Sequence, residues 1–200
     1  MNIADRKKFY LARNTILDIL EDRGYIVAEN LKMSIDEFMI QYDSGEMYIY
    51  TKNSNEDKKS IYIYFHLENR NFQKKDLTNL ITTVNNQYQN ENIKIIVITR
   101  DKLNQAILRE IERTDNIESF ILNQLIINIT KHIMMPKFEV ISDNEIEILL
   151  KEFSITKNQL PKILLTDPIS RYFGVKSGDI FKITRSSPTT GLSISYRLVK

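Results

Sequence analysis

Apolar residues recur every three or four positions near the start of the chain, which is the spacing of one buried helical face. The residues on this stripe are Phe9, Ala12, Ile16, Ile19 and Leu20. The spacing predicts an amphipathic helix over residues 4–22. Gly24 follows it, and glycine accepts the left-handed conformation that commonly ends a helix. Ser34 and Glu37 then have the spacing of a capping box, which predicts a second, short helix.

The pattern next changes to a period of two, which is typical of strands. The apolar segments that follow are strand-like at Met47–Thr51 and Ile61–Phe65, helical at Leu77–Tyr88, strand-like at Ile93–Ile98, helical at Leu103–Ile111 and strand-like at Ile117–Leu122. The segment Ile93–Ile98 is nearly continuous in β-branched residues, as expected of a strand buried on both faces. This alternation predicts an α/β layer with a mixed sheet that includes parallel pairs.

From about residue 126 the segments become shorter and are separated by proline and glycine. Ser142 and Glu145 form a second capping box before another amphipathic helix. The residues that separate the later strand-like runs are Pro161, Pro168, Gly174, Gly178 and Gly191. We therefore predict two domains, an α/β domain over residues 1–125 and a small α+β domain over residues 126–200.

The dipeptide Asp167-Pro168 predicts a specific local structure. Proline favours the first position of a helix, and an aspartate before it can accept hydrogen bonds from the amides of Ile169 or Ser170. Gly174 then suits the end of one helical turn. We interpret Asp167 as an architectural cap, since no second titratable side chain stands at a spacing that would make it a catalytic carboxylate.

Composition excludes several kinds of chemistry. The 200 residues include no cysteine and two histidines, so disulfides, thiolate metal sites and cysteine nucleophiles are excluded. His66 and His132 lack a second ligand at helical spacing, and Gly174–Gly178 lacks the lysine of a phosphate-binding loop. No serine-hydrolase elbow is present. We expect no catalytic residue, metal, cofactor or small-molecule substrate, and the apolar runs are too short to span a membrane.

The charges favour a binding role. The net charge is only +2, which argues against bulk neutralisation of nucleic acid. Basic residues nevertheless gather in the last thirty positions and alternate with aromatic ones. They are Arg171, Lys176, Lys182, Arg185, Arg197 and Lys200, with Tyr172, Phe173, Phe181 and Tyr196 between them. Two interpretations remain open: a surface for an acidic partner, and a set of solvated strand-face charges.

The later motifs resemble one family closely. Leu160-Pro161-Lys162-Ile163, Asp167-Pro168 with Tyr172-Phe173-Gly174, and Tyr196-Arg197-Leu198-Val199 occur in the order and spacing of the fifth subunit of eukaryotic DNA-dependent RNA polymerases and its archaeal counterpart. The first helix with Asp22–Val27 is similar to the amino-terminal part of eukaryotic members. The resemblance covers essentially the whole chain and is strongest after residue 125.

The resemblance implies a non-catalytic polymerase subunit. Residues 1–125 would be a jaw domain near downstream duplex DNA, and residues 126–200 an assembly domain that docks on the largest subunit among the other subunits. The docking candidates are Arg171, Tyr172, Lys182, Arg185 and Arg197; the structural motif residues are Pro161, Asp167, Pro168, Gly174, Gly178 and Gly191. The alternative is a free-standing nucleic-acid-binding transcription regulator.

Two departures from the family concern local structure and source. Leu103-Asn104-Gln105-Ala106 stands where many members have Thr-Pro-Ser-Ala, so we expect the following helix to begin earlier. Isoleucine and asparagine are abundant while alanine occurs only four times, which is the bias of an AT-rich genome. This divergence favours a large DNA virus over a low-GC eukaryote. The expected location is accordingly the nucleus for a cellular protein, and the virion or a cytoplasmic viral factory for a viral one.

Overall fold

The computed structural model describes residues 3–45, 47–53, 59–68, 70–88, 93–114, 116–187 and 191–200. Its chain divides into two compact units, with the division between Ile127 and Asn128. The sequence pattern placed the boundary between two domains after residue 125. Each of the two compact units, unit 1 (residues 1–127) and unit 2 (residues 128–200), has its own four-stranded sheet.

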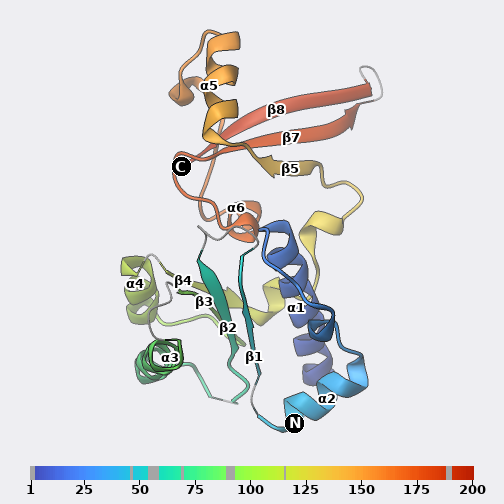
Figure 1. The fold of residues 1–200 in the computed structure, drawn as a ribbon, viewed down its shortest axis with the longest axis vertical. Coiled ribbons are helices and arrows are strands. Elements are labelled where there is room, and N and C mark those ends of the chain that lie inside the picture. Colours follow the sequence, from blue (N-terminus) through green and yellow to red (C-terminus); the bar gives the residue numbers. More distant parts are fainter. Residues whose placement is uncertain are drawn as a thin grey trace. The chain divides into compact units, whose positions relative to one another are not determined.

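Unit 1 is an α/β layer (Figure 1). Its helices are α1 (Ile3–Asp22), α2 (Ile35–Asp43), α3 (Lys74–Gln87) and α4 (Gln105–Arg113), with short 3-10 turns at Glu29–Leu31 and Leu122–Gln124. Its strands are β1 (Tyr48–Thr51), β2 (Ser60–Phe65), β3 (Ile93–Thr99) and β4 (Ile117–Ile121).

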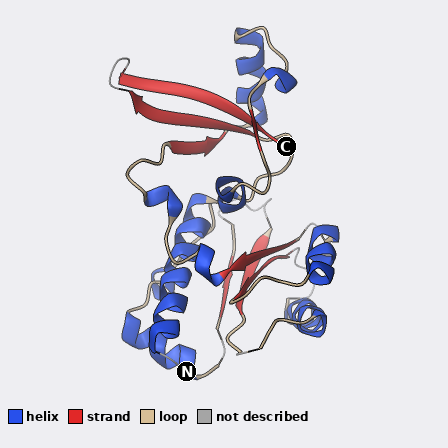
Figure 2. Cartoon of the chain, turned by 180° about the vertical axis from the view of Figure 1, so that it is seen from behind, coloured by secondary structure: helices blue, strands red, loops and turns tan. Residues whose placement is uncertain are grey.

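The sheet of unit 1 has the order β1-β2-β3-β4. Strands β2, β3 and β4 are parallel, whereas β1 pairs with β2 in the antiparallel direction, which confirms the predicted mixed sheet. Helices α1 and α2 lie on one side of this sheet, and α3 and α4 lie on the other (Figure 2). Because both faces are covered, Ile95, Ile96, Val97 and Ile98 of β3 are all buried.

Helix α1 buries the predicted stripe completely. Phe9, Ala12, Ile16 and Leu20 are each 0% exposed. The second predicted helix also forms, because the Glu37 carboxylate accepts the Ser34 amide at 2.7 Å and the Ser34 hydroxyl accepts the Glu37 amide at 3.3 Å. These reciprocal bonds satisfy amide donors that a helix start otherwise leaves without partners.

Two charged features of unit 1 interrupt the apolar pattern. Arg13 lies on α1 and is 2% exposed, and its Nη1 donates to the Leu31 carbonyl at 2.5 Å. Burial lowers the pKa of the Arg13 guanidinium. The second feature is Glu118 on β4, which accepts from Arg23 at 2.9 Å and from Lys94 at 2.5 Å. Glu118 therefore joins the end of α1 to the β3–β4 pair.

Helix α4 corrects one expectation. The helix begins at Gln105 and not earlier, because the side chain of Asn104 accepts the amide of Ala106 at 3.4 Å as an N-cap. Asparagine is among the preferred N-cap residues. Leu103, which fits the helical spacing, lies before the helix and packs against the apolar cluster that includes Ile107 and Ile111.

Unit 2 is a small α+β layer. Its helices are α5 (Asp143–Glu152) and α6 (Pro168–Phe173), with 3-10 turns at Ile129–Lys131 and Lys157–Gln159. Its strands are β5 (Lys137–Val140), β6 (Lys162–Ile163), β7 (Ile180–Ser187) and β8 (Gly191–Val199). The sheet order is β5-β7-β8-β6, so β7 and β8 are the internal strands. The β7–β8 pair is antiparallel and the short β6–β8 pair is parallel.

Each face of the second sheet carries its own apolar cluster. On one face, Ile180 and Leu198 pack with Ile141, Ile146 and Leu149 around α5. The opposite face packs around α6 and consists of Ile163, Ile169, Phe181, Ile183 and Val199, with Phe138 and Phe173 beside them. Among the described residues, no helix is long and apolar enough to cross a membrane.

Candidate functional site

Helix α6 has the local geometry predicted for Asp167-Pro168. The Asp167 Oδ1 atom accepts the amide of Ile169 at 2.9 Å, and Pro168 occupies the start of the helix. Gly174 ends it with φ 62° and ψ 36°, a left-handed conformation that an L side chain disfavours. The predicted Asp167 cap at the start of α6 is therefore confirmed.

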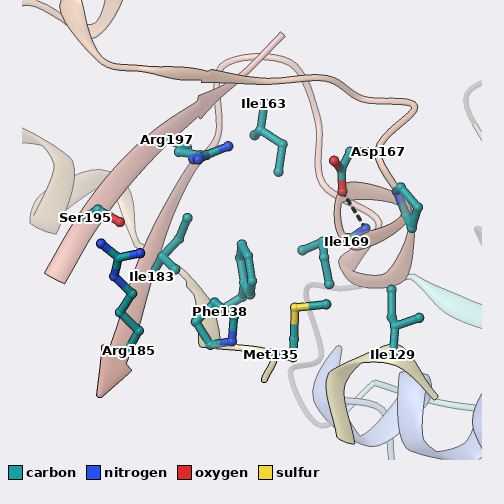
Figure 3. Close-up of a pocket in the computed structure, with 12 residues that line it drawn as sticks. Ile129, Met135, Phe138, Ile163, Asp167, Ile169, Ile183, Arg185, Ser195 and Arg197 are labelled. Carbon is teal, nitrogen blue, oxygen red and sulfur yellow. Dashed lines mark hydrogen bonds between the residues drawn. The ribbon is translucent and has the colours of Figure 1, made fainter. Parts of the chain in front are cut away.

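A pocket of about 460 Å³ lies between α6 and the sheet of unit 2 (Figure 3). Apolar side chains from the strands, α6 and the loop before β5 form most of its surface. They are Ile129, Met135, Pro136, Phe138, Ile163, Pro168, Ile169 and Ile183. The polar residues around it are Asp167, Arg185, Ser195 and Arg197. We call this site the arginine pocket.

The strand register places both arginines on the pocket face of the sheet. Arg197 pairs with Phe181, Ser195 with Ile183 and Arg185 with Ser193. Because side chains alternate between faces along a strand, Arg197, Ser195 and Arg185 point to the same side. Figure 3 shows them along one wall, with Asp167 across the apolar floor. Both arginines are exposed.

The other docking candidates lie elsewhere in unit 2. Tyr172 was expected at a docking surface but is only 3% exposed, and its hydroxyl lies 3.3 Å from both Asn128 Nδ2 and Thr130 Oγ1. It is therefore part of the interior. Arg171 lies on α6 and is half-buried.

Lys182 also lies away from the pocket. It pairs with Tyr196 and so points to the opposite face from Arg185. There it acts on Glu139, whose pKa is held below its usual range chiefly by the hydrogen bond from Lys137, with a weaker contribution from the Lys182 charge.

The predicted turn residues hold the strands of the sheet. The carbonyl of Pro161 accepts the Leu198 amide at 2.8 Å, which begins the β6–β8 pairing. The amide of Gly178 donates to the Val199 carbonyl at 3.0 Å just before β7, and Gly191 opens β8. These contacts position β8, and with it Ser195 and Arg197.

Neither histidine takes part in a cluster of metal ligands. His66 is 2% exposed, its Nε2 lies 2.9 Å from the Arg70 carbonyl, and its ring packs edge-on to Phe72. His132 is exposed and accepts the Met134 amide through Nδ1. Within the described ranges, no three aspartate, glutamate, histidine or cysteine side chains gather as metal ligands. What the geometry offers is a binding pocket with cationic groups beside an apolar floor.

The fold and the site thus define a protein with one α/β unit and one α+β unit, the second of which carries an arginine-flanked pocket. Residues 4–84 match the family described as RNA polymerase Rpb5, N-terminal domain, and residues 127–199 match its C-terminal domain. The chain belongs to the Rpb5 family of eukaryotic-type RNA polymerase subunits.

Relatives from three organisms show how far the similarity extends. Subunit 5B of DNA-directed RNA polymerases IV and V of Arabidopsis thaliana is 32% identical, with 96% of this chain and 89% of the relative covered. RPABC1 of Caenorhabditis elegans, a subunit of polymerases I, II and III, is 28% identical, with 96% and 95% covered. The corresponding subunit of Dictyostelium discoideum is 29% identical, with 97% and 98% covered.

Proposed function

We propose that this chain is a non-catalytic subunit of a multisubunit DNA-directed RNA polymerase. In the assembled enzyme, unit 2 docks on the largest subunit and unit 1 forms part of the lower jaw near downstream DNA. The observation that carries the proposal is similarity along nearly the full length of polymerase subunits, with 96% of this chain matched to the Arabidopsis thaliana relative. Polymerase subunits from a plant, a nematode and Dictyostelium discoideum share this similarity.

The docking role is supported by the arginine pocket. Its apolar floor and exposed arginines resemble the composition of protein–protein interfaces, where apolar residues, methionine and arginine are enriched. An arginine fork also pairs with a carboxylate in a fixed geometry, which suits a specific docking contact. Arg185 and Arg197 are therefore the residues that we assign to docking.

The jaw role is supported by the match of residues 4–84 to the N-terminal domain of the family. We propose a nuclear location on the same basis, because the relatives described above are subunits of eukaryotic polymerases. These relatives give no support to the viral source that composition favoured, so we do not propose a virion or viral-factory location.

Co-purification tests the docking role directly. A tagged chain expressed in cells of the organism that encodes it should co-purify with the two largest polymerase subunits, which mass spectrometry would identify. Arg185→Glu with Arg197→Glu should abolish this recovery, because two repelling charges then face the partner. Lys162→Glu with Lys182→Glu is the matched control, because both lysines lie on the opposite face of the sheet. Equal recovery by both double variants would remove the pocket from the docking interface.

DNA binding separates this role from that of a free-standing regulator. A direct binder with several phosphate contacts loses about 0.9 log unit of affinity per contact for each log unit of salt. With a net charge of +2, the purified chain should bind short duplex DNA weakly and with a shallow salt dependence. Tight binding with a steep slope, in a chain that recovers no polymerase, would favour the regulator.

A further inference from the structure

The Cα atoms of the two arginines of the arginine pocket have a defined spacing along the strand direction. Arg197 stands opposite Phe181, and Arg185 lies four residues further along β7. At the rise of a β-strand, four residues correspond to about 13 Å along the sheet. Ser195 and Ile183 form the pair between them on the same face.

Neither guanidinium has a carboxylate partner among the residues that the structure describes. Arg6, Arg23, Arg70 and Arg100, in contrast, each lie within 4.0 Å of a carboxylate. The carboxylate that lines the pocket belongs to Asp167, and its Oδ1 atom is engaged by the Ile169 amide. Arg185 and Arg197 are therefore available to carboxylates from another molecule.

The surface between the arginines is mostly apolar, with Ser195 beside the apolar side chains. Ile163, Ile169 and Ile183 are each less than 10% exposed and form the floor with Phe138. Met135 lies between Phe138 and Ile169 (Figure 3), and the flexible thioether of methionine adapts to different apolar partners. The pocket volume of about 460 Å³ is within the range of sites that enclose ligands.

This arrangement corresponds to the side-chain geometry of an extended peptide. In a strand, residues i, i+2 and i+4 point to one face, and residues i and i+4 are about 13 Å apart. Acidic residues at i and i+4 would thus meet the two arginines while an apolar residue at i+2 enters the pocket. A nucleic acid fits less well, because the floor is mostly apolar and, apart from Ser195, offers its sugars few polar partners.

We infer that the arginine pocket binds an extended segment of another polymerase subunit with the pattern acidic-x-apolar-x-acidic. The inference rests on the proposed function for the source of the segment. The chemistry that it requires is charge-assisted pairing at both ends and apolar burial at the centre.

A synthetic peptide tests the inference on the full chain. The probe is Glu-Thr-Leu-Thr-Glu with glycine at both ends and with blocked termini, titrated into protein carrying labelled isoleucine methyl groups. The methyl signals of Ile163, Ile169 and Ile183 should shift, whereas those of Ile16 and Ile96 in unit 1 should not. Replacing both glutamates by glutamine, or the leucine by serine, should weaken binding at least about tenfold.

Substitutions in the protein provide the matched comparison. The double variant Arg185→Gln with Arg197→Gln should bind the probe peptide at least about tenfold more weakly. The double variant Lys162→Gln with Lys182→Gln should change the affinity for the peptide less than about twofold. The inference is overturned if the pocket methyl signals do not respond, if the glutamine peptide binds as well, or if both double variants weaken the probe equally. A single-stranded oligonucleotide that shifts the same methyl signals more strongly would also overturn it.

These results are distinguishable from failure of the proposed function. Peptide binding with the expected variant pattern, in a chain that recovers no polymerase from cells, would leave the pocket chemistry in place and refute the polymerase role. Recovery of polymerase by a chain whose pocket does not bind the peptide would support the polymerase role and refute the inferred pocket chemistry.

Discussion

The guanidinium of Arg23 lies 2.9 Å from the carboxylate of Glu118, although 95 residues separate them in the sequence. Arg23 follows α1 and its side chain is 5% exposed, whereas Glu118 lies on the edge strand β4. Lys94 of β3 binds the other carboxylate oxygen at 2.5 Å. One carboxylate therefore balances two cations and holds the first helix to the last strand of unit 1.

Glu118→Gln should destabilise unit 1. The substitution leaves the nearly buried Arg23 without its carboxylate, so the free energy of unfolding should fall by about 2 to 3 kcal/mol. Urea unfolding followed by circular dichroism measures the change. Glu110→Gln is the control, because its ion pair with Lys74 is exposed and should contribute little. Equal losses from both variants would contradict the role assigned to Glu118.

Acid should destabilise unit 1 through the same carboxylate. Burial raises the pKa of Glu118, but the charges of Arg23 and Lys94 outweigh it and hold this pKa below 4.5. Hydrogen bonds from Arg70 likewise lower the pKa of Asp76 from 3.8 to about 2. Because both folded pKa values are depressed, their stabilisation is complete above the ordinary values and is lost as pH falls through the folded ones.

The urea midpoint of unit 1 should therefore decline as pH falls below 4.5, and the decline should continue towards about 2. It should be shallower in a chain with both Glu118→Gln and Asp76→Asn. An unchanged slope in that double variant would show that other carboxylates dominate the acid response.

Asp167 distinguishes a structural cap from a catalytic carboxylate. Asp167→Asn should be mild, because an amide oxygen can still accept the Ile169 amide. Asp167→Ala should lower the free energy of unfolding of unit 2 by about 1 kcal/mol, the usual effect of a lost cap. Thermal unfolding measures both. Loss of transcription in Asp167→Asn, with folding and assembly intact, would instead indicate a chemical role.

Gly174 provides a test of backbone conformation. Its φ of 62° disfavours any residue with a Cβ atom, so Gly174→Ala should destabilise unit 2 by about 1 to 2 kcal/mol. Gly174→Asn should lose less, because asparagine tolerates the left-handed region better than alanine does. Chemical denaturation of the two variants provides the comparison, and the reverse order would be evidence against the left-handed cap.

Unit 2 should fold in isolation. Both of its apolar clusters consist of residues after Asn128. Its length also exceeds the roughly 40 residues below which a domain usually needs disulfides, metals or oligomerisation to fold. A fragment of residues 126–200 should give a dispersed amide spectrum. Phe181→Ala should abolish the dispersed spectrum. Phe181 is 0% exposed, so its truncation should lower the free energy of unfolding by about 3 to 5 kcal/mol. Leu192→Ala, at a position 68% exposed, should preserve it.

Local periodicity predicted the helices and strands of this protein well, because the interactions that form them join residues close together in the sequence. The α1 stripe, the two capping boxes and the Asp167 cap each depend on residues a few positions apart. The parallel pairing of β2, β3 and β4 also followed from the alternation of helices and strands. Asn104 was the exception, because its capping role was hidden by the helical spacing of Leu103.

The long-range contacts were beyond prediction from pattern. The burial of Arg13 on α1 depends on the Leu31 carbonyl, which the 3-10 turn supplies 18 residues further along the chain. Tyr172 looked like an interface aromatic, but Asn128 and Thr130 meet its hydroxyl inside unit 2. The sequence named five docking candidates without placing them on a face of the sheet. The strand register shows that Arg185 and Arg197 share one face and that Lys182 lies on the other.

The sheet order of unit 2 has a consequence for synthesis on the ribosome. Strand β8 is internal, so its residues must be made before β6 can pair and before Val199 can complete the cluster under α6. The sheet of unit 1, in contrast, is complete once Ile121 has emerged. A nascent chain would therefore carry a finished first unit while β7 still lacks its main partner. Because β7 and β8 are adjacent in the sequence, the two strands leave the ribosome exit tunnel one after the other, and β7 presents an unpaired edge only until β8 follows it.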